Sequence, residues 1–200
     1  MKTDSVAALW LVTLQEIMDR AAHEVKDSLN GVSLNLEVIR SRVARPDIAS
    51  KDVVGFAEAA SGQFEVLTAR VEAMLALARP PRAGGATDLA QALKLLSTLL
   101  VPAARADGRT LKVDGYEQSV PTAAPVQAVR LALASGMLSL VKGSKSGRCT
   151  LHSGPEPVVR FSHESAATCS LDSAVADALA GCNINTRRSD HDLLIEFPGP

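Results

Sequence analysis

The feature that most constrains this chain is a pair of long apolar periodicities in its first eighty residues. Apolar or small residues recur at steps of three or four from Leu11 to Val43, and again from Val53 to Ala78. Such spacing places one apolar seam along each of two long helices. Between them, Pro46 disfavours helix at Arg45 and predicts a turn. The two helices are therefore expected to form an antiparallel hairpin.

A hairpin of this length cannot enclose a core by itself. Each seam leaves apolar surface facing water unless further helices cover it. A second copy of the chain, related by two-fold symmetry, would supply those helices and complete a four-helix bundle. We therefore expect the hairpin to form a homodimer.

The pattern changes at a segment rich in proline and glycine, Pro80 to Gly85, which predicts a linker over residues 80–87. Beyond it, helical spacing alternates with short strand-like segments. The expected helices are Asp88 to Ala106, with Asp88 as the cap, Pro125 to Lys142 and Asp172 to Ala180. The expected strands are Thr110 to Val113, Arg148 to His152, Pro157 to Ser162, Asn183 to Arg187 and Leu193 to Phe197. This order predicts an α+β domain over residues 88–200, with helices on one face of a mostly antiparallel sheet, after a hairpin over residues 1–79.

Composition excludes several classes of protein. The 21 basic residues are matched by 22 acidic ones and give a net charge of -1, so no basic excess is available to neutralise a nucleic acid. No segment approaches the roughly 18 continuous apolar residues of a membrane helix, and the N-terminus does not resemble a signal peptide. We expect a cytoplasmic protein that binds neither nucleic acid nor membrane.

Cysteine and the tail histidines do not form a metal-binding pattern. The three cysteines are widely spaced, which predicts buried thiols in a reducing compartment. His152, His163 and His191 have no acidic or thiol partner at metal-ligand spacing, which predicts surface or strand-edge histidines.

His23 is the sharpest candidate for chemistry. It lies two residues from the seam positions Ala21 and Val25, so its ring is expected to point away from the core. A neutral imidazole is a good nucleophile near neutral pH, and an exposed ring on a stiff helix offers the in-line access that phosphoryl transfer requires. From the residues alone, two interpretations stay open: a phosphoryl acceptor, or an ordinary solvated histidine.

The segment His23 to Asn30, with the sequence HEVKDSLN, resembles the H-box of histidine kinases. In that family a His-Glu pair, a basic residue and a Leu six places after the His recur on the first helix of a dimerising hairpin. Leu34 to Glu37 resembles the usual continuation. The resemblance implies that His23 accepts a phosphoryl group and that Glu24 is its acid–base helper. The expected site residues are His23, Glu24 and Asp27 for the chemistry, and Asp19, Arg20, Lys26 and Asn30 for partner binding.

Charged neighbours give these residues their expected roles. Arg20 and Lys26 could accompany the phosphoryl charge, and a carboxylate of Asp27, Glu24 or Asp19 could fix the ring tautomer. Asp27 and Ser28 stand where the family commonly has Asn or Thr followed by Pro. This departure puts a phosphatase activity in doubt and implies a less kinked helix.

The second half resembles the ATP-binding domain of the same kinases in its order of elements, without the residues that bind ATP. Ser139 aligns with the magnesium-binding Asn of a working kinase. His163 to Thr168 contains no glycine where the family has Asp followed by glycines, and Gly181 is the only glycine between Glu156 and Glu196. Nothing visible would cradle a triphosphate, so we expect no ATP binding and no cofactor.

A phosphoacceptor hairpin followed by a degenerate ATPase-like domain resembles bacterial phosphorelay phosphotransferases. The resemblance implies a dimeric histidine phosphotransferase, not an ATP-dependent kinase, which relays a phosphoryl group between response-regulator receiver domains through His23. The receiver would supply the magnesium. Two alternatives remain. One is a non-catalytic pseudokinase scaffold or inhibitor that binds a receiver domain or a histidine kinase, and the other is an active kinase with an unusual nucleotide site.

Overall fold

The computed structural model describes residues 2–44, 51–80, 87–163, 169–189 and 192–200. The predicted turn around Pro46, most of the predicted linker, residues 164–168 and His191 lie outside the described residues. Within the described ranges, no helix combines the length and the hydropathy that crossing a membrane requires.

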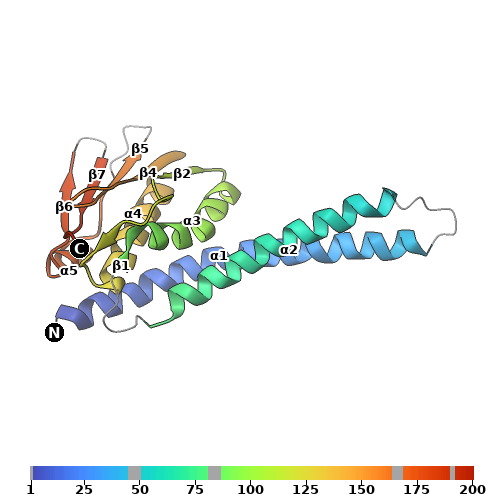
Figure 1. The fold of residues 1–200 in the computed structure, drawn as a ribbon, viewed down its shortest axis with the longest axis horizontal. Helices are drawn as coiled ribbons and strands as arrows, with labels where there is room; N and C mark the ends of the chain where they lie inside the picture. The colour runs from blue at the N-terminus through green and yellow to red at the C-terminus, as the bar shows by residue number, and fades with distance from the viewer. Residues whose placement is uncertain (1, 45–50, 81–86, 164–168, 190–191) are drawn as a thin grey trace.

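The N-terminal part is an antiparallel hairpin of two helices, as predicted (Figure 1). Helix α1 spans Lys2–Val43 and helix α2 spans Lys51–Ala78. Because α1 is much longer than α2, its first part runs on past the end of α2 and lies along the rest of the molecule. There Val6, Trp10 and Ile17 are buried in the core.

The remainder is an α+β layer, which confirms the predicted fold class. Its helices are α3 (Leu89–Ala106), α4 (Val126–Gly143) and α5 (Ser173–Ala180). Its main strands are β2 (Thr110–Asp114), β4 (Ser146–His152), β5 (Val158–His163), β6 (Asn185–Arg188) and β7 (Asp192–Glu196). They form a sheet in the order β2-β4-β5-β7-β6, in which only β2 and β4 pair in parallel. Every predicted helix and strand of this half is present, with ends that differ by at most two residues.

A small ladder before α3 was not predicted. Strand β1 (Thr87–Asp88) pairs with β3 (Pro121–Thr122) in antiparallel fashion. Thr87 therefore belongs to the α+β layer, although its position falls in the segment that sequence assigns to the linker. Two-residue strands carry no periodicity, so only the tertiary structure reveals them. Asp88 caps α3 as predicted, because its carboxylate accepts the N–H of Ala90 at 2.9 Å.

Three layers share one core. Helices α3 and α4 cover one face of the sheet, and α1 packs on the outer side of these helices (Figure 1). A single buried cluster includes Trp10 of α1, Leu77 of α2, Leu96 of α3 and Phe161 of β5. The hairpin is thus joined to the α+β layer along the first half of α1, and its other half projects beyond the layer (Figure 1).

Candidate functional site

His23 lies on the outer surface of α1, where its side chain is exposed. Helix α1 is continuous from Lys2 to Val43, so the spacing of its residues fixes their direction. Ala21, two residues before His23, is buried at 1% exposure, and Val25, two residues after it, is half-buried. Residues two apart do not share a helix face, so the imidazole points away from both. The expected exposure of His23 agrees with the structure.

Glu24 points in another direction, toward α2. Its carboxylate lies 3.6 Å from the guanidinium of Arg70, and the two side chains are only 15% and 11% exposed. Arg70 also donates hydrogen bonds to the backbone carbonyl of Glu24 at 2.9 Å and to the hydroxyl of Ser28 at 2.6 Å. The carboxylate that the H-box resemblance names as an acid–base helper is therefore engaged inside the hairpin.

Arg70 is a residue that sequence reasoning missed. It follows the buried Leu67 by three residues, and Glu24 follows the buried Ala21 by the same step. A charged residue placed at core spacing on each of two paired helices is a signal for a buried ion pair. That signal could have identified Glu24 and Arg70 as partners.

Arg20 ties the hairpin to the α+β layer. Its guanidinium contacts the carboxylate of Glu16 at 3.4 Å and that of Asp107 at 3.1 Å. Glu16 in turn lies 2.8 Å from the ammonium of Lys142 on α4. Arg20 lies one turn before His23, so this network borders the candidate site.

The four other predicted site residues are on the surface of α1. Their side chains are all exposed: Asp19, Lys26, Asp27 and Asn30. Asp19 and Asp27 lie four residues on either side of His23, the spacing at which helix side chains meet. Asp19, Arg20, Lys26 and Asp27 thus lie within four residues of His23 on α1, whereas Asn30 lies seven residues after it and Glu24 faces α2.

An apolar stripe runs along the hairpin beside this site. The predicted seam of each helix divides into a buried face and an uncovered one. On α2, Ala60 and Leu67 are buried, whereas Phe64 and Val71 are 59% and 39% exposed. On α1, the uncovered stripe holds the exposed Leu11, Leu29, Leu36 and Val43 together with the half-buried Met18 and Val25, and on α2 it holds the exposed Ala57, Phe64, Val71 and Leu75. Steps of seven residues recur on both helices, and this heptad spacing is typical of helix-bundle interfaces.

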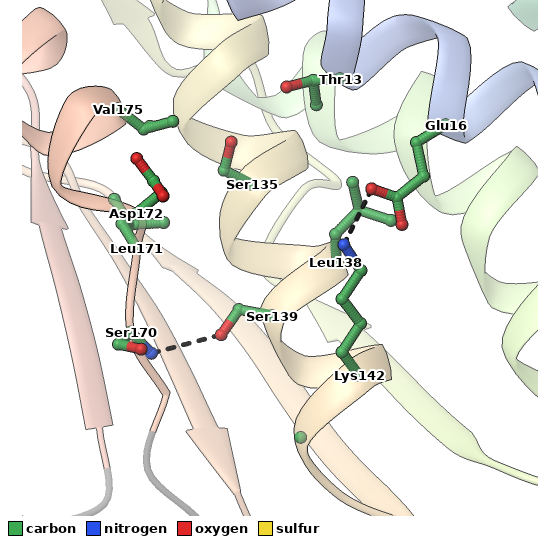
Figure 2. Close-up of a pocket in the computed structure, with 11 residues that line it drawn as sticks. Thr13, Glu16, Ser135, Leu138, Ser139, Lys142, Ser170, Leu171, Asp172 and Val175 are labelled. Atoms are coloured by element: carbon green, nitrogen blue, oxygen red, sulfur yellow. Dashed lines mark hydrogen bonds and ion pairs between the residues drawn. The ribbon is translucent and has the colours of Figure 1, made fainter.

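A cleft of about 420 Å³ lies between α1, α4 and α5 (Figure 2). Ser139, which the resemblance to histidine kinases places at the position of a magnesium-binding Asn, lies in its wall. The Ser139 hydroxyl lies 3.2 Å from Cys169 Sγ and accepts the N–H of Ser170 at 3.3 Å. Lys142 is held by Glu16, and the wall also carries the carboxylate of Asp172. The described lining residues therefore include two carboxylates and one lysine, and the lysine is already paired with Glu16.

The described cysteines and histidines other than His23 form no metal-binding cluster. Cys149 and Cys169 are buried as predicted, whereas Cys182 is only half-buried. Burial raises the pKa of the Cys149 and Cys169 thiols, so neither is a thiolate near neutral pH. No cluster of three or more His, Cys, Asp or Glu side chains suited to a metal occurs among the described residues. The expectation for His163 was wrong: this residue ends the central strand β5 and is buried at 7% exposure.

Comparisons with known proteins find similarity among solved structures. No protein-family model matches the chain, and no curated protein matches it in sequence. Among solved structures, the chain is similar to the histidine kinase AdeS of Acinetobacter baumannii. The TM-score is 0.46 at 12% identity, and the alignment covers 88% of this chain and 98% of that chain. At this identity, the roles of individual residues rest on the geometry of the chain itself.

Proposed function

We propose that this chain is a histidine phosphotransfer protein, which relays a phosphoryl group between response-regulator receiver domains through His23 without binding ATP. The observation that carries the proposal is the placement of His23. The ring is exposed on a continuous helix, in a segment that resembles an H-box, and it is clear of the buried face at Ala21. A receiver domain can therefore reach it from the solvent side.

The transfer itself needs little from the chain beyond a positioned nucleophile. The unprotonated ring nitrogen of His23 attacks the phosphorus of a receiver's aspartyl phosphate. A P–N bond forms as the P–O bond breaks, and the receiver carboxylate leaves with the electron pair of that bond. Lys26 and Arg20 lie three residues on either side of His23, where their charges can accompany the phosphoryl group. The receiver's acidic pocket supplies magnesium.

Asp19 and Asp27 are the better candidates for orienting the ring. Both carboxylates are exposed at four residues from His23, and a hydrogen bond from one ring N–H would fix the tautomer. Glu24 can act as acid–base helper only after leaving Arg70, which would strand a largely buried guanidinium. Glu24→Gln is therefore expected to slow transfer less than Asp27→Asn does.

Dimerisation through the uncovered stripe is part of this proposal. The stripe is long and runs along both helices. Its spacing of seven residues suits a four-helix bundle with a second copy of the hairpin. Water-exposed Leu36 at 54% and Phe64 at 59% would be covered in that bundle. His23 lies outside the stripe, so dimerisation would leave it accessible.

The test is a transfer assay with the full chain. The chain is incubated with each receiver domain of the host, phosphorylated on its aspartate, and protein-bound label is assayed for acid lability and base stability. We expect such label on the wild type and on His152→Gln, a matched change of another exposed histidine, but not on His23→Gln. Equal labelling of His23→Gln and wild type contradicts the proposal.

A non-catalytic scaffold is the second candidate. Arg20 and Glu24, two of the groups that would assist transfer, are already engaged in ion pairs, and this favours a surface that binds a partner without carrying phosphate. A scaffold would stay unlabelled in the same assay and would bind a receiver or a histidine kinase equally well after His23→Gln. Phosphotransfer predicts label that depends on His23.

A further inference from the structure

Four alternating charges connect three helices next to His23. Asp107 contacts Arg20 at 3.1 Å, Arg20 contacts Glu16 at 3.4 Å, and Glu16 contacts Lys142 at 2.8 Å. Glu16 and Arg20 belong to α1, Asp107 follows α3, and Lys142 ends α4. Arg20 and Asp107 are 87 positions apart in the chain, so only the packing of α3 on α1 brings them together.

Asp107 is held in place by the end of α3. It is the C-cap residue, and its backbone N–H donates to the carbonyl of Ala103 at 3.2 Å. Gly108 then turns the chain with a φ of 68° in the left-handed region, and its N–H donates to the carbonyl of Arg105 at 3.0 Å. The carboxylate of Asp107 is therefore presented to α1 by a hydrogen-bonded turn.

Arg20 is also the nearest guanidinium to His23 along α1. The two residues are three apart and share a helix surface. Helix side chains lean toward the N-terminus, so the imidazole leans over the turn that carries Arg20. A phosphoryl group on the ring would place roughly two negative charges and three acceptor oxygens beside that guanidinium. Phosphate is a stronger partner for Arg than a single exposed carboxylate, because it accepts bidentate hydrogen bonds from a planar fork.

We propose that Arg20 is shared between Asp107 and the phosphoryl group on His23, so that phosphorylation releases Asp107 and loosens the contact of α3 with α1. This inference rests on the proposed function. Asp107 is a positioning residue in this scheme, since it acts only through Arg20. Coupling of this kind is reciprocal: a change that weakens the contact between Arg20 and Asp107 favours the phosphorylated state by the same factor.

The α+β layer thereby gains a role other than nucleotide binding. Its contact with the hairpin reports whether His23 carries phosphate, and a partner that recognises the end of α3 would distinguish the two forms. The ion pair of Arg20 and Asp107 is partly exposed, so its loss should have a modest effect. We expect phosphorylation to raise the equilibrium constant for opening of the turn at the end of α3 by about two- to fivefold.

The test uses the full chain and a chemical donor, phosphoramidate, which needs no partner. The P–N bond of the donor breaks and ammonia leaves with a proton as the new P–N bond forms at the ring. Phosphohistidine is followed by phosphorus NMR, with His23→Gln to subtract signal from other histidines. Hydrogen exchange is then measured at the amides of Asp107, Gly108 and Arg109, which are hydrogen-bonded in the turn.

We expect phosphorylation of the wild type to speed exchange at these three amides by about two- to fivefold. Asp107→Asn should show the faster exchange without phosphate and no further change with it, and Arg20→Gln should behave in the same way. Asp107→Glu, which keeps a carboxylate, should restore part of the response. Asp114→Asn is the matched control, because Asp114 is as exposed as Asp107 and pairs with Arg148 on the sheet, and it should respond like the wild type.

Two failures can be told apart. Label on His23 with unchanged exchange in the wild type overturns the inference and leaves the proposed function standing. A phosphate-dependent change in exchange, with no receiver domain able to donate to or accept from His23, supports the inference and overturns the relay. Absence of any label on His23 overturns both.

Discussion

Arg130 of α4 donates a hydrogen bond from its guanidinium to the backbone carbonyl of Leu77, in the last turn of α2, at 3.1 Å. The same guanidinium also donates to the carbonyls of Ala76 at 3.1 Å and Arg79 at 3.0 Å. The last carbonyls of a helix lack partners within it, and α2 has no basic residue of its own in its last turn. The α+β layer thus caps the hairpin and fixes where it ends.

Removing that cap should destabilise the protein. Arg130→Ala leaves several carbonyls at the end of α2 without their donor, so the free energy of unfolding should fall by about 1–3 kcal/mol. Arg130→Lys should lie between the wild type and Arg130→Ala, because an ammonium cannot reproduce a planar fork. Urea denaturation measures both. Arg187→Ala removes an exposed arginine that forms a surface ion pair with Glu196, so it should cost less than about 1 kcal/mol. A loss in this control as large as that in Arg130→Ala would show that the contacts of Arg130 have no special role.

The pair of Glu24 and Arg70 should show strong energetic coupling. Arg70→Gln leaves a largely buried carboxylate without its cation, and Glu24→Gln leaves a largely buried guanidinium without its anion, so each should cost about 1–3 kcal/mol. The double variant should cost less than the sum of the two, with a coupling of at least about 0.5 kcal/mol. A double-mutant cycle by urea denaturation measures it, with the exposed Glu58→Gln as a neutral control. Additive losses would show that the contact contributes nothing.

A charged residue in the uncovered stripe should separate the proposed dimer. Phe64→Asp places a carboxylate in the middle of the expected bundle interface, where its desolvation is unfavourable. Val66→Asp is the matched control, because Val66 is also exposed but lies two residues away and outside the stripe. Sedimentation velocity should show a dimer for the wild type and Val66→Asp and a monomer for Phe64→Asp. A monomeric wild type would contradict dimerisation through the stripe.

His163 should make stability depend on pH. Ser144 donates its hydroxyl to the carbonyl of Ser146 at 2.6 Å, so its oxygen accepts from Nδ1 of His163 at 2.8 Å. Nε2 is buried with no hydrogen-bond partner among the described residues. Protonation there would create a buried cation without a hydrogen-bond acceptor among the described residues. Burial accordingly lowers the pKa of His163 from 6.5.

The lowered pKa of His163 determines how stability changes with pH. Between the lowered folded pKa and about 6.5 the unfolded chain binds a proton that the folded chain does not, so stability is full above this window and falls as the pH drops through it. Denaturation midpoints measured between pH 7 and pH 5 should therefore decrease. His163→Leu should flatten the slope, whereas the exposed His152→Gln should preserve it. An unchanged slope in His163→Leu would assign the dependence to other groups.

Local pattern was enough for most elements and for the direction of His23. The period of three and four predicted α1 and α2, the spacing to Ala21 predicted an exposed ring, and Asp88 was identified as a cap from its position before an apolar helix. These properties depend on residues within one or two turns, and a helix fixes how such neighbours are oriented.

Only the tertiary structure decided which helices and strands contact one another, and therefore which side chains are covered. Spacing identified Phe64 and Leu67 as members of one seam, but only packing left the first exposed and buried the second. Spacing placed Arg20 on the same helix surface as His23, and only the end of α3 brought Asp107 to it. A sequence period specifies which residues of a helix share a face, whereas the neighbour that covers each face depends on contacts between distant parts of the chain. For that reason the sequence alone determined the helices, the five strands of the main sheet and the exposure of His23, whereas the fold decided the short ladder of β1 and β3 and which charges surround His23.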